Sequence, residues 1–178
     1  CRSLLEKYRN EPTVMHIAGT NCHPRHFPSR FSYRFSKYPY VWGWASWRRA
    51  WRRYDVELRT WPGWKSGEEF RRLCPDFRER SYWTAIFDLM HAGAIDTWDY
   101  PWIYSCWFHG GLSIVPRANL ISNIGFGQDA THVSVDSPYA NLPLGVIGRV
   151  RHPRILRTNS RDDRLFFNRV IIRQPDML

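Results

Sequence analysis

The sequence predicts an α/β protein that forms a single domain over residues 1–178. Two observations carry this prediction: a helical pattern leads into a short strand pattern at residues 14–19, and another leads into an apolar run at 112–115. Short apolar strands that follow helices are typical of central, parallel strands. A hydrophobic content of 43% excludes general disorder, and the apolar runs are too short to span a bilayer.

The first forty residues predict a helix, a strand and a long loop. The helix covers residues 3–9 and ends before Pro12, because proline cannot continue a helix. The strand at 14–19 ends at a glycine turn. Residues 20–36 are polar and rich in His and Arg, which predicts a functional loop or lid.

Residues 44–54 predict a helix with two different faces. One face carries the aromatic residues Trp44, Trp47, Trp51 and Tyr54, and the other carries Arg48, Arg49, Arg52 and Arg53. Interleaved aromatics and arginines can stack on bases or sugars and hold phosphates. Helical spacing alone favours a simpler interpretation, in which the Trp face belongs to the core and the Arg face is solvated.

The second half predicts helices at residues 67–73, 79–91 and 97–109, the first of them capped by Ser66. A strand at 112–115 follows Gly110-Gly111, and residues 119–121 are expected to pair with a neighbour. A glycine-bearing loop covers 125–137. The remaining residues, 138–178, predict an irregular tail with a last helix at 161–169.

The charge favours anionic partners. The chain has 26 basic and 16 acidic residues, and 23 of the basic residues are Arg. Arginine suits planar recognition of phosphate and carboxylate, so nucleic acid, a nucleotide diphosphate or an acidic lipid surface are the candidate classes. The four cysteines show no C-x-x-C spacing, which favours ordinary reduced thiols in an intracellular protein over a zinc site.

Asp96 and Asp99 stand among aromatic residues at the start of the predicted helix 97–109. In one interpretation Asp96 is the helix N-cap, with Asp99 at the third helical position. In the other, Asp99 is a carboxylate held between aromatic walls, where it acts as a general base. The two interpretations are compatible.

Residues 123–132 combine glycines with polar ligands. Gly125 and Gly127 allow the backbone to approach a ligand closely, and Asp129 with His132 could hold a divalent metal. Hydrogen bonding within the loop is the alternative role for that pair. The glycine spacing lacks a third glycine, so a dinucleotide-binding fingerprint is not supported.

Three blocks together resemble bacterial nucleotide-sugar glycosyltransferases related to family 2, some of which carry the name hemolytic protein. Residues 35–51 read FSKYPYVWGWASWRRAW, residues 98–102 read WDYPW, and residues 119–132 read NLISNIGFGQDATH. The sequence is also distantly similar to the N-acetylglucosaminyltransferase that begins complex N-glycan branching. In that enzyme the Asp directly after a Trp is the catalytic base, and this position matches Asp99.

The resemblance implies a glycosyltransferase A (GT-A) fold and transfer of a sugar, with inversion, from a nucleotide-diphosphate sugar to a glycan or lipid-linked acceptor. It implies Mn²⁺ or Mg²⁺ as cofactor and a cytoplasmic location, with peripheral contact to the inner face of the membrane. Asp99 would be the base, and His132 and Asp129 would be metal ligands. The implied donor- and acceptor-binding residues are Trp42, Gly43, Trp44, Trp98, Trp102, Gly125 and Gly127.

One part of the family pattern is missing. Members carry a short acidic motif at the end of a strand, whereas the nearest match here, Asp162-Asp163, lies in the tail. We therefore expect the chain to be the C-terminal part of the enzyme, with the N-terminal nucleotide-binding half largely missing. A basic nucleic-acid-binding module and a non-catalytic carbohydrate-binding fragment are the alternatives. No nucleic-acid partner is expected, because the Trp helix is too apolar on one side.

Overall fold

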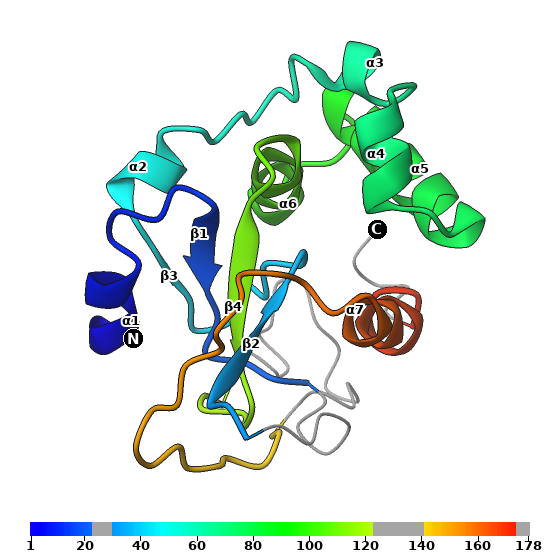
Figure 1. Cartoon of the computed structure of the whole chain (residues 1–178). Coiled ribbons are helices and arrows are strands. Elements are labelled where there is room, and N and C mark those ends of the chain that lie inside the picture. Colours follow the sequence, from blue (N-terminus) through cyan, green and yellow to red (C-terminus); the bar gives the residue numbers. More distant parts are fainter. Residues whose placement is uncertain (23–29, 123–140, 174–178) are drawn as a thin grey trace.

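The computed structural model describes residues 1–22, 30–122 and 141–173 (Figure 1). Within these residues, four strands form one sheet in the order β2-β4-β1-β3. The strands are β1 (Val14–Ile17), β2 (Tyr33–Ser36), β3 (Ala45–Ser46) and β4 (Leu112–Pro116). The predicted α/β class is confirmed, and the sheet is mixed.

The two predicted strands are the central pair of the sheet and run parallel. All four residues of β1 are buried, as expected for a strand covered on both faces. The outer strands are antiparallel to their neighbours: β3 pairs with β1, and β2 pairs with β4. Residues 119–121 form no strand, although Leu120 N–H donates to Gly19 O at 3.0 Å beside the end of β1.

Two predictions in the first half need correction. The loop expected at 20–36 is wrong over residues 33–36, which form β2 because the Tyr33 and Phe35 rings pack in the core on one face of the sheet. Residues 23–29 of that loop lie outside the described residues. The expected helix at 44–54 shrinks to α2 (Arg48–Trp51), preceded by β3. Trp47 is extended, and its indole N–H donates to Leu5 O at 3.0 Å. The aromatic residues 44–54 therefore divide between the two sides of the sheet.

Most of the other helices lie close to the predicted positions. They are α1 (Arg2–Lys7), α4 (Glu68–Leu73), α5 (Phe77–His91), α6 (Asp99–Phe108), α7 (Ser160–Phe166) and the π-helix η2 (Phe167–Ile171). The short helix α3 (Trp61–Trp64) was not predicted. The N-cap of α4 is Gly67 and not Ser66. No helix in the described part of the chain is long and apolar enough to cross a membrane.

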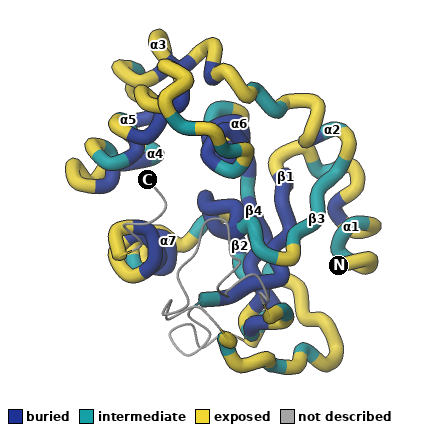
Figure 2. The backbone as a smooth tube through the Cα atoms, turned by 180° about the vertical axis from the view of Figure 1, so that it is seen from behind, coloured by how far each residue is buried: buried dark blue, intermediate teal, exposed yellow. Residues whose placement is uncertain are grey.

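The core has two parts, one on each face of the sheet. Helix α1 covers one face, where Tyr8 packs with Ile17, Phe35 and Ile114. On the other face α6 lies between the sheet and the group α3–α5, and it is buried along most of its length (Figure 2). Trp61, Trp83 and Trp102 are fully buried there. Much of the tryptophan content is therefore structural.

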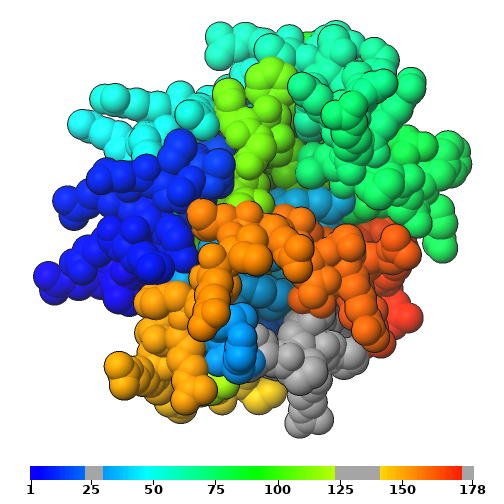
Figure 3. Space-filling view, viewed as in Figure 1, coloured from blue at the N-terminus to red at the C-terminus, as the bar shows by residue number. Residues whose placement is uncertain are grey.

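The C-terminal segment is packed onto the rest of the fold. Asp163 in α7 accepts hydrogen bonds from Ser36 Oγ at 2.6 Å and from Lys37 N at 3.3 Å. Asp162 forms an ion pair with Arg34 at 3.5 Å. Figure 3 shows this segment on the front face, between the first residues of the chain and the group α3–α5. The predicted last helix is confirmed, and its two aspartates have structural partners.

Candidate functional site

Asp99 is the first residue of α6 and is partly buried. Its Oδ1 accepts hydrogen bonds from Thr97 Oγ1 at 2.6 Å and from Tyr100 N at 2.8 Å. The predicted capping role of Asp96 was wrong, because the N-cap is Trp98 and Asp96 is exposed. Both hydrogen bonds to Asp99 from described residues go to Oδ1. Oδ2 therefore remains for another partner.

The Asp99 carboxylate lines a cavity of about 90 Å³ where several elements meet. Its lining residues include Thr20, which follows β1, and Trp42, which precedes β3. Phe166 of α7 and Val170 of η2 line it as well. Among the described lining residues, Asp99 is the one carboxylate and most of the others are apolar or aromatic. In open α/β sheets, ligands bind beyond the carboxyl ends of parallel strands.

Three backbone segments approach closely beside this cavity. Thr20 Oγ1 donates to Trp42 O at 2.8 Å. A Cβ on Gly19 would lie 2.5 Å from Gly43 O, and a Cβ on Gly43 would lie 2.8 Å from Ile121 Cγ2. Gly43 also has φ +59°, a conformation that favours glycine. The predicted site residue Gly43 therefore sets the backbone path beside Trp42.

A partly exposed aromatic ladder, made of Trp98, Trp44, Trp51 and Tyr54, lies next to Asp99. Trp98 stacks on Trp44 with ring centroids 5.4 Å apart, Trp44 contacts Trp51 at 5.7 Å, and Trp51 stacks on Tyr54 at 4.6 Å. Trp98 is 43% exposed and Trp51 is 42% exposed. Burial, and after it the charge of Asp99, raises the pKa of Tyr54.

The tryptophans predicted for the site occupy three different environments. Trp44 and Trp98 belong to the ladder and Trp42 lines the cavity, so the fold brings all three close to Asp99 or its neighbour. Trp102 is fully buried and belongs to the core. Trp51 and Tyr54 were missing from the predicted site. Their helical spacing from Trp44 and Trp47 was visible, but it did not distinguish core rings from exposed ones.

His16 anchors the inner side of the aromatic ladder. Its ring stacks on Trp44 at 5.2 Å, and Nδ1 accepts the indole N–H of Trp102 at 3.1 Å. Nε2 therefore carries the proton and donates to Tyr40 O at 2.9 Å. Burial lowers the pKa of His16 to about 4, so the ring is neutral at pH 7. This histidine holds the site in place and is not available for proton transfer.

The arginines of α2 have different roles. Arg49 donates to the carbonyls of Tyr8, Arg9 and Val14, at 2.8 Å, 2.9 Å and 2.8 Å, and so joins α2 to the α1–β1 connection. Arg48 is exposed and lines a shallow cavity of about 300 Å³ together with Trp44 and Trp51. Of the two, only Arg48 is placed to meet a ligand.

The predicted metal ligands Asp129 and His132, and the glycines Gly125 and Gly127, lie outside the described residues. In the part that is described, there is no group of three His, Cys, Asp or Glu residues that could hold a metal ion. Asp162 and Asp163 are paired within the fold, as described above.

Comparisons with known proteins add no further constraint. No protein-family model, curated protein or solved structure matches the chain significantly. The chemistry of the site therefore has to be inferred from the geometry and from the motifs of the chain itself.

Proposed function

We propose that the chain is part of a glycosyltransferase that moves a sugar, with inversion, from a nucleotide-diphosphate sugar to a hydroxyl acceptor. The observation that supports this most is the placement of Asp99, a carboxylate that lines a cavity beyond the parallel strands and lies next to exposed tryptophans. Trp42, Trp44 and Trp98 are the predicted partners of this carboxylate. Trp98 adjoins Asp99 in the sequence, whereas the proximity of Trp42 and Trp44 depends on the fold.

Asp99 acts as the general base in this proposal. An inverting transfer needs one carboxylate to take the proton of the acceptor hydroxyl while its oxygen attacks the anomeric carbon. Oδ1 is held by Thr97 and Tyr100, so Oδ2 is the oxygen that receives this proton. The bond to the nucleotide diphosphate breaks as the new glycosidic bond forms, and the diphosphate leaves with the electron pair.

The aromatic ladder binds the sugar rings. Indole faces pack on the apolar faces of pyranose rings, and Trp98 is exposed directly beside Asp99 in the sequence. Tyr54 OH donates to Trp98 O at 3.2 Å, which fixes the backbone just before the base. We assign the acceptor to the ladder and the cavity together, with a glycan or a lipid-linked oligosaccharide as its class.

The resemblance implies Mn²⁺ or Mg²⁺, but the described residues do not form a metal site. We therefore assign no step at these residues to a metal ion. In this proposal the sheet is the acceptor half of a GT-A fold, and the acidic motif for the donor diphosphate lies on sequence outside these residues. We place the protein in the cytoplasm, at the inner face of the membrane when the acceptor is lipid-linked.

The test is Asp99→Asn in the complete protein that the gene encodes, with Asp96→Asn as the matched control. Asp96 is exposed three residues earlier and does not cap the helix. Loss of a general base lowers turnover by about 10²–10⁴-fold. We expect this loss in Asp99→Asn with donor binding retained by calorimetry, and unchanged turnover in Asp96→Asn. Wild-type turnover in Asp99→Asn would exclude Asp99 as the base.

A further inference from the structure

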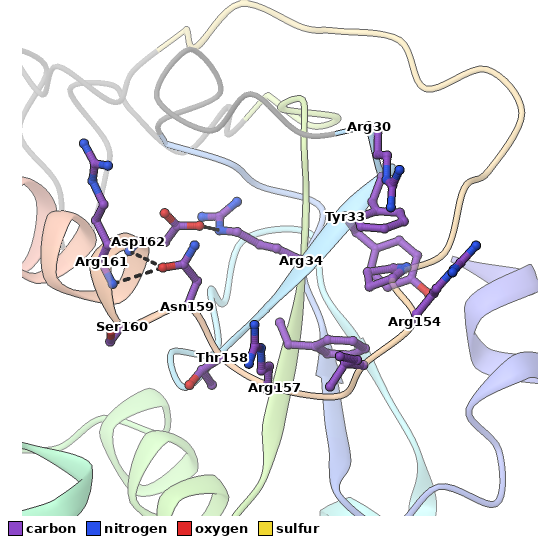
Figure 4. Close-up of a pocket in the computed structure, with 14 residues that line it drawn as sticks. Arg30, Tyr33, Arg34, Arg154, Arg157, Thr158, Asn159, Ser160, Arg161 and Asp162 are labelled. Carbon is purple, nitrogen blue, oxygen red and sulfur yellow. Dashed lines mark hydrogen bonds and ion pairs between the residues drawn. The ribbon is translucent and has the colours of Figure 1, made fainter.

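A second and larger pocket, of about 950 Å³, lies between β2 and residues 153–162 (Figure 4). The C-terminal segment is fixed to the strand on both sides of it. Ser32 N donates to Arg151 O at 2.8 Å, and Phe35 forms a parallel β-bridge with Thr158. Between these two attachments the segment leaves the strand and the pocket opens. The backbone therefore defines this pocket.

The lining of this pocket is strongly basic. Five of its residues are arginines: Arg30, Arg34, Arg154, Arg157 and Arg161. Asp162 is the one acidic residue among the described lining residues, and it pairs with Arg34 at 3.5 Å. Five positive charges against one negative charge leave four that are not balanced within the lining. Guanidinium groups bind phosphate oxygens in a planar, bidentate manner.

These arginines differ in their grouping from the other exposed arginines of the chain. They come from two regions about 120 residues apart in sequence, the start of β2 and residues 154–161, and they surround one cavity. Arg71 and Arg78, by contrast, are exposed at α4 and α5 and line none of the cavities described here. A general excess of arginine explains exposed residues like these two. It does not explain why five arginines from two distant segments line one pocket.

We propose that this pocket binds an organic diphosphate. In an organic diphosphate the inner phosphate carries one negative charge and the terminal phosphate about two at neutral pH, so about three negative charges would meet the four remaining positive charges. Phe31 and Ile155 also line the pocket, and Ile155 is largely exposed there. They provide an apolar contact for the organic group. A nucleoside diphosphate and a polyprenyl diphosphate share this chemistry.

The pocket is distinct from the Asp99 cavity but adjoins it. Arg34 lines the pocket, and its Nη2 donates to Tyr40 OH at 3.4 Å. Tyr40 in turn lines the Asp99 cavity. A ligand held by Arg34 therefore lies one side chain away from the cavity with the proposed base. The diphosphate site does not depend on the proposed transferase activity.

The test is calorimetric titration of the full chain with sodium pyrophosphate, UDP and geranyl diphosphate, at fixed salt and with EDTA to exclude metal-dependent donor binding. The pocket variant is Arg154→Gln with Arg157→Gln. The matched control is Arg71→Gln with Arg78→Gln, which removes the same charge from exposed helical positions. All four side chains are exposed, so the variants are expected to fold, and circular dichroism checks this.

We expect pyrophosphate to bind, with affinity lowered about tenfold or more in the pocket variant and about twofold or less in the control. We also expect either UDP or geranyl diphosphate to bind more tightly than pyrophosphate. The tighter of the two shows whether the natural ligand is a nucleoside diphosphate or a polyprenyl diphosphate. Absence of binding, or an equal loss in both variants, would overturn the proposal. So would both organic ligands binding more weakly than pyrophosphate. Asp99→Asn is expected to leave binding unchanged, and a loss in that variant alone would place the ligand in the other cavity.

Discussion

At the scale of single residues, the site depends on a few side chains whose hydrogen bonds and burial define their roles. Asp99 is held by its own turn, and His16 is locked as a neutral ring between Tyr40 and Trp102. Trp98 presents its face to solvent, whereas Trp102, four residues later, is fully buried. The same residue type in the same short motif therefore serves a surface in one case and the core in the other.

Gly43 is the residue whose replacement tests the backbone path at the site. Gly43→Ala adds a Cβ that would lie 2.8 Å from Ile121 Cγ2, at φ +59°. We expect the free energy of unfolding to fall by about 1–3 kcal/mol, because both strain and overlap must be relieved. Urea denaturation measures this change.

Gly63→Ala is the matched control for Gly43→Ala. Gly63 lies in α3, and an added Cβ there meets nothing within 4 Å. Alanine has a higher helix propensity than glycine, so this variant is expected to be as stable as the wild type or more stable. Equal destabilisation by the two substitutions would show that the close approach at Gly43 is not important.

The sequence could single out the proposed base but not which tryptophans surround it. A Trp-Asp pair at a helix start identified Asp99, because both the helical pattern and the motif fall on these residues. Exposure of Trp51 and burial of Trp102 depend on how α2 and α6 pack, because the two rings contact each other at 5.1 Å. Contacts between segments fifty residues apart carry no local signal in one sequence.

At the scale of elements, the predictions succeeded where one pattern extended over a whole element. Helix α5 has a clear helical pattern, and Asp76 Oδ1 accepts the N–H groups of Arg78 and Glu79 as its N-cap. The helix predicted at 44–54 was wrong at its start, because Ala45 and Ser46 form β3 and pair with β1. Tertiary pairing there outweighed a helical spacing that spanned only four aromatic residues.

The contact between α7 and β2 predicts a dependence of stability on pH. Burial raises the pKa of Asp163 from 3.8 to about 6, against opposing effects of Ser36, Lys37 and Arg34. The folded state therefore binds this proton more tightly than the unfolded state. The contribution of Asp163 to the unfolding free energy falls by about 3 kcal/mol in all as pH rises from well below 4 to well above 6.

Denaturation of wild type and Asp163→Asn at several pH values measures this contribution. Other groups titrate in the same range: His16, whose pKa is lowered by burial, acts in the opposite direction. The difference between the two proteins isolates Asp163, and we expect it to change between pH 4 and pH 6. A difference that stays constant over this range would contradict the buried environment of the carboxyl group.

At the scale of the whole molecule, the fold places two different cavities on neighbouring parts of the sheet. The Asp99 cavity is small and mostly apolar, and the pocket between β2 and residues 153–162 is large and basic. Arg34 and Tyr40 connect them through a hydrogen bond. The net charge of +10 predicted an anionic partner, but the grouping of five arginines around one pocket depends on the packing of the C-terminal segment against β2.

The most direct test of the central claim uses the complete protein that the gene encodes, with Mn²⁺ and a panel of UDP-, GDP- and dTDP-sugars. We expect hydrolysis or transfer with one donor, and loss of that turnover in Asp99→Asn. Turnover of one donor would establish the class and identify the sugar. No turnover with any donor of the panel, together with no donor binding by calorimetry, would contradict the proposed glycosyltransferase activity and favour a binding module.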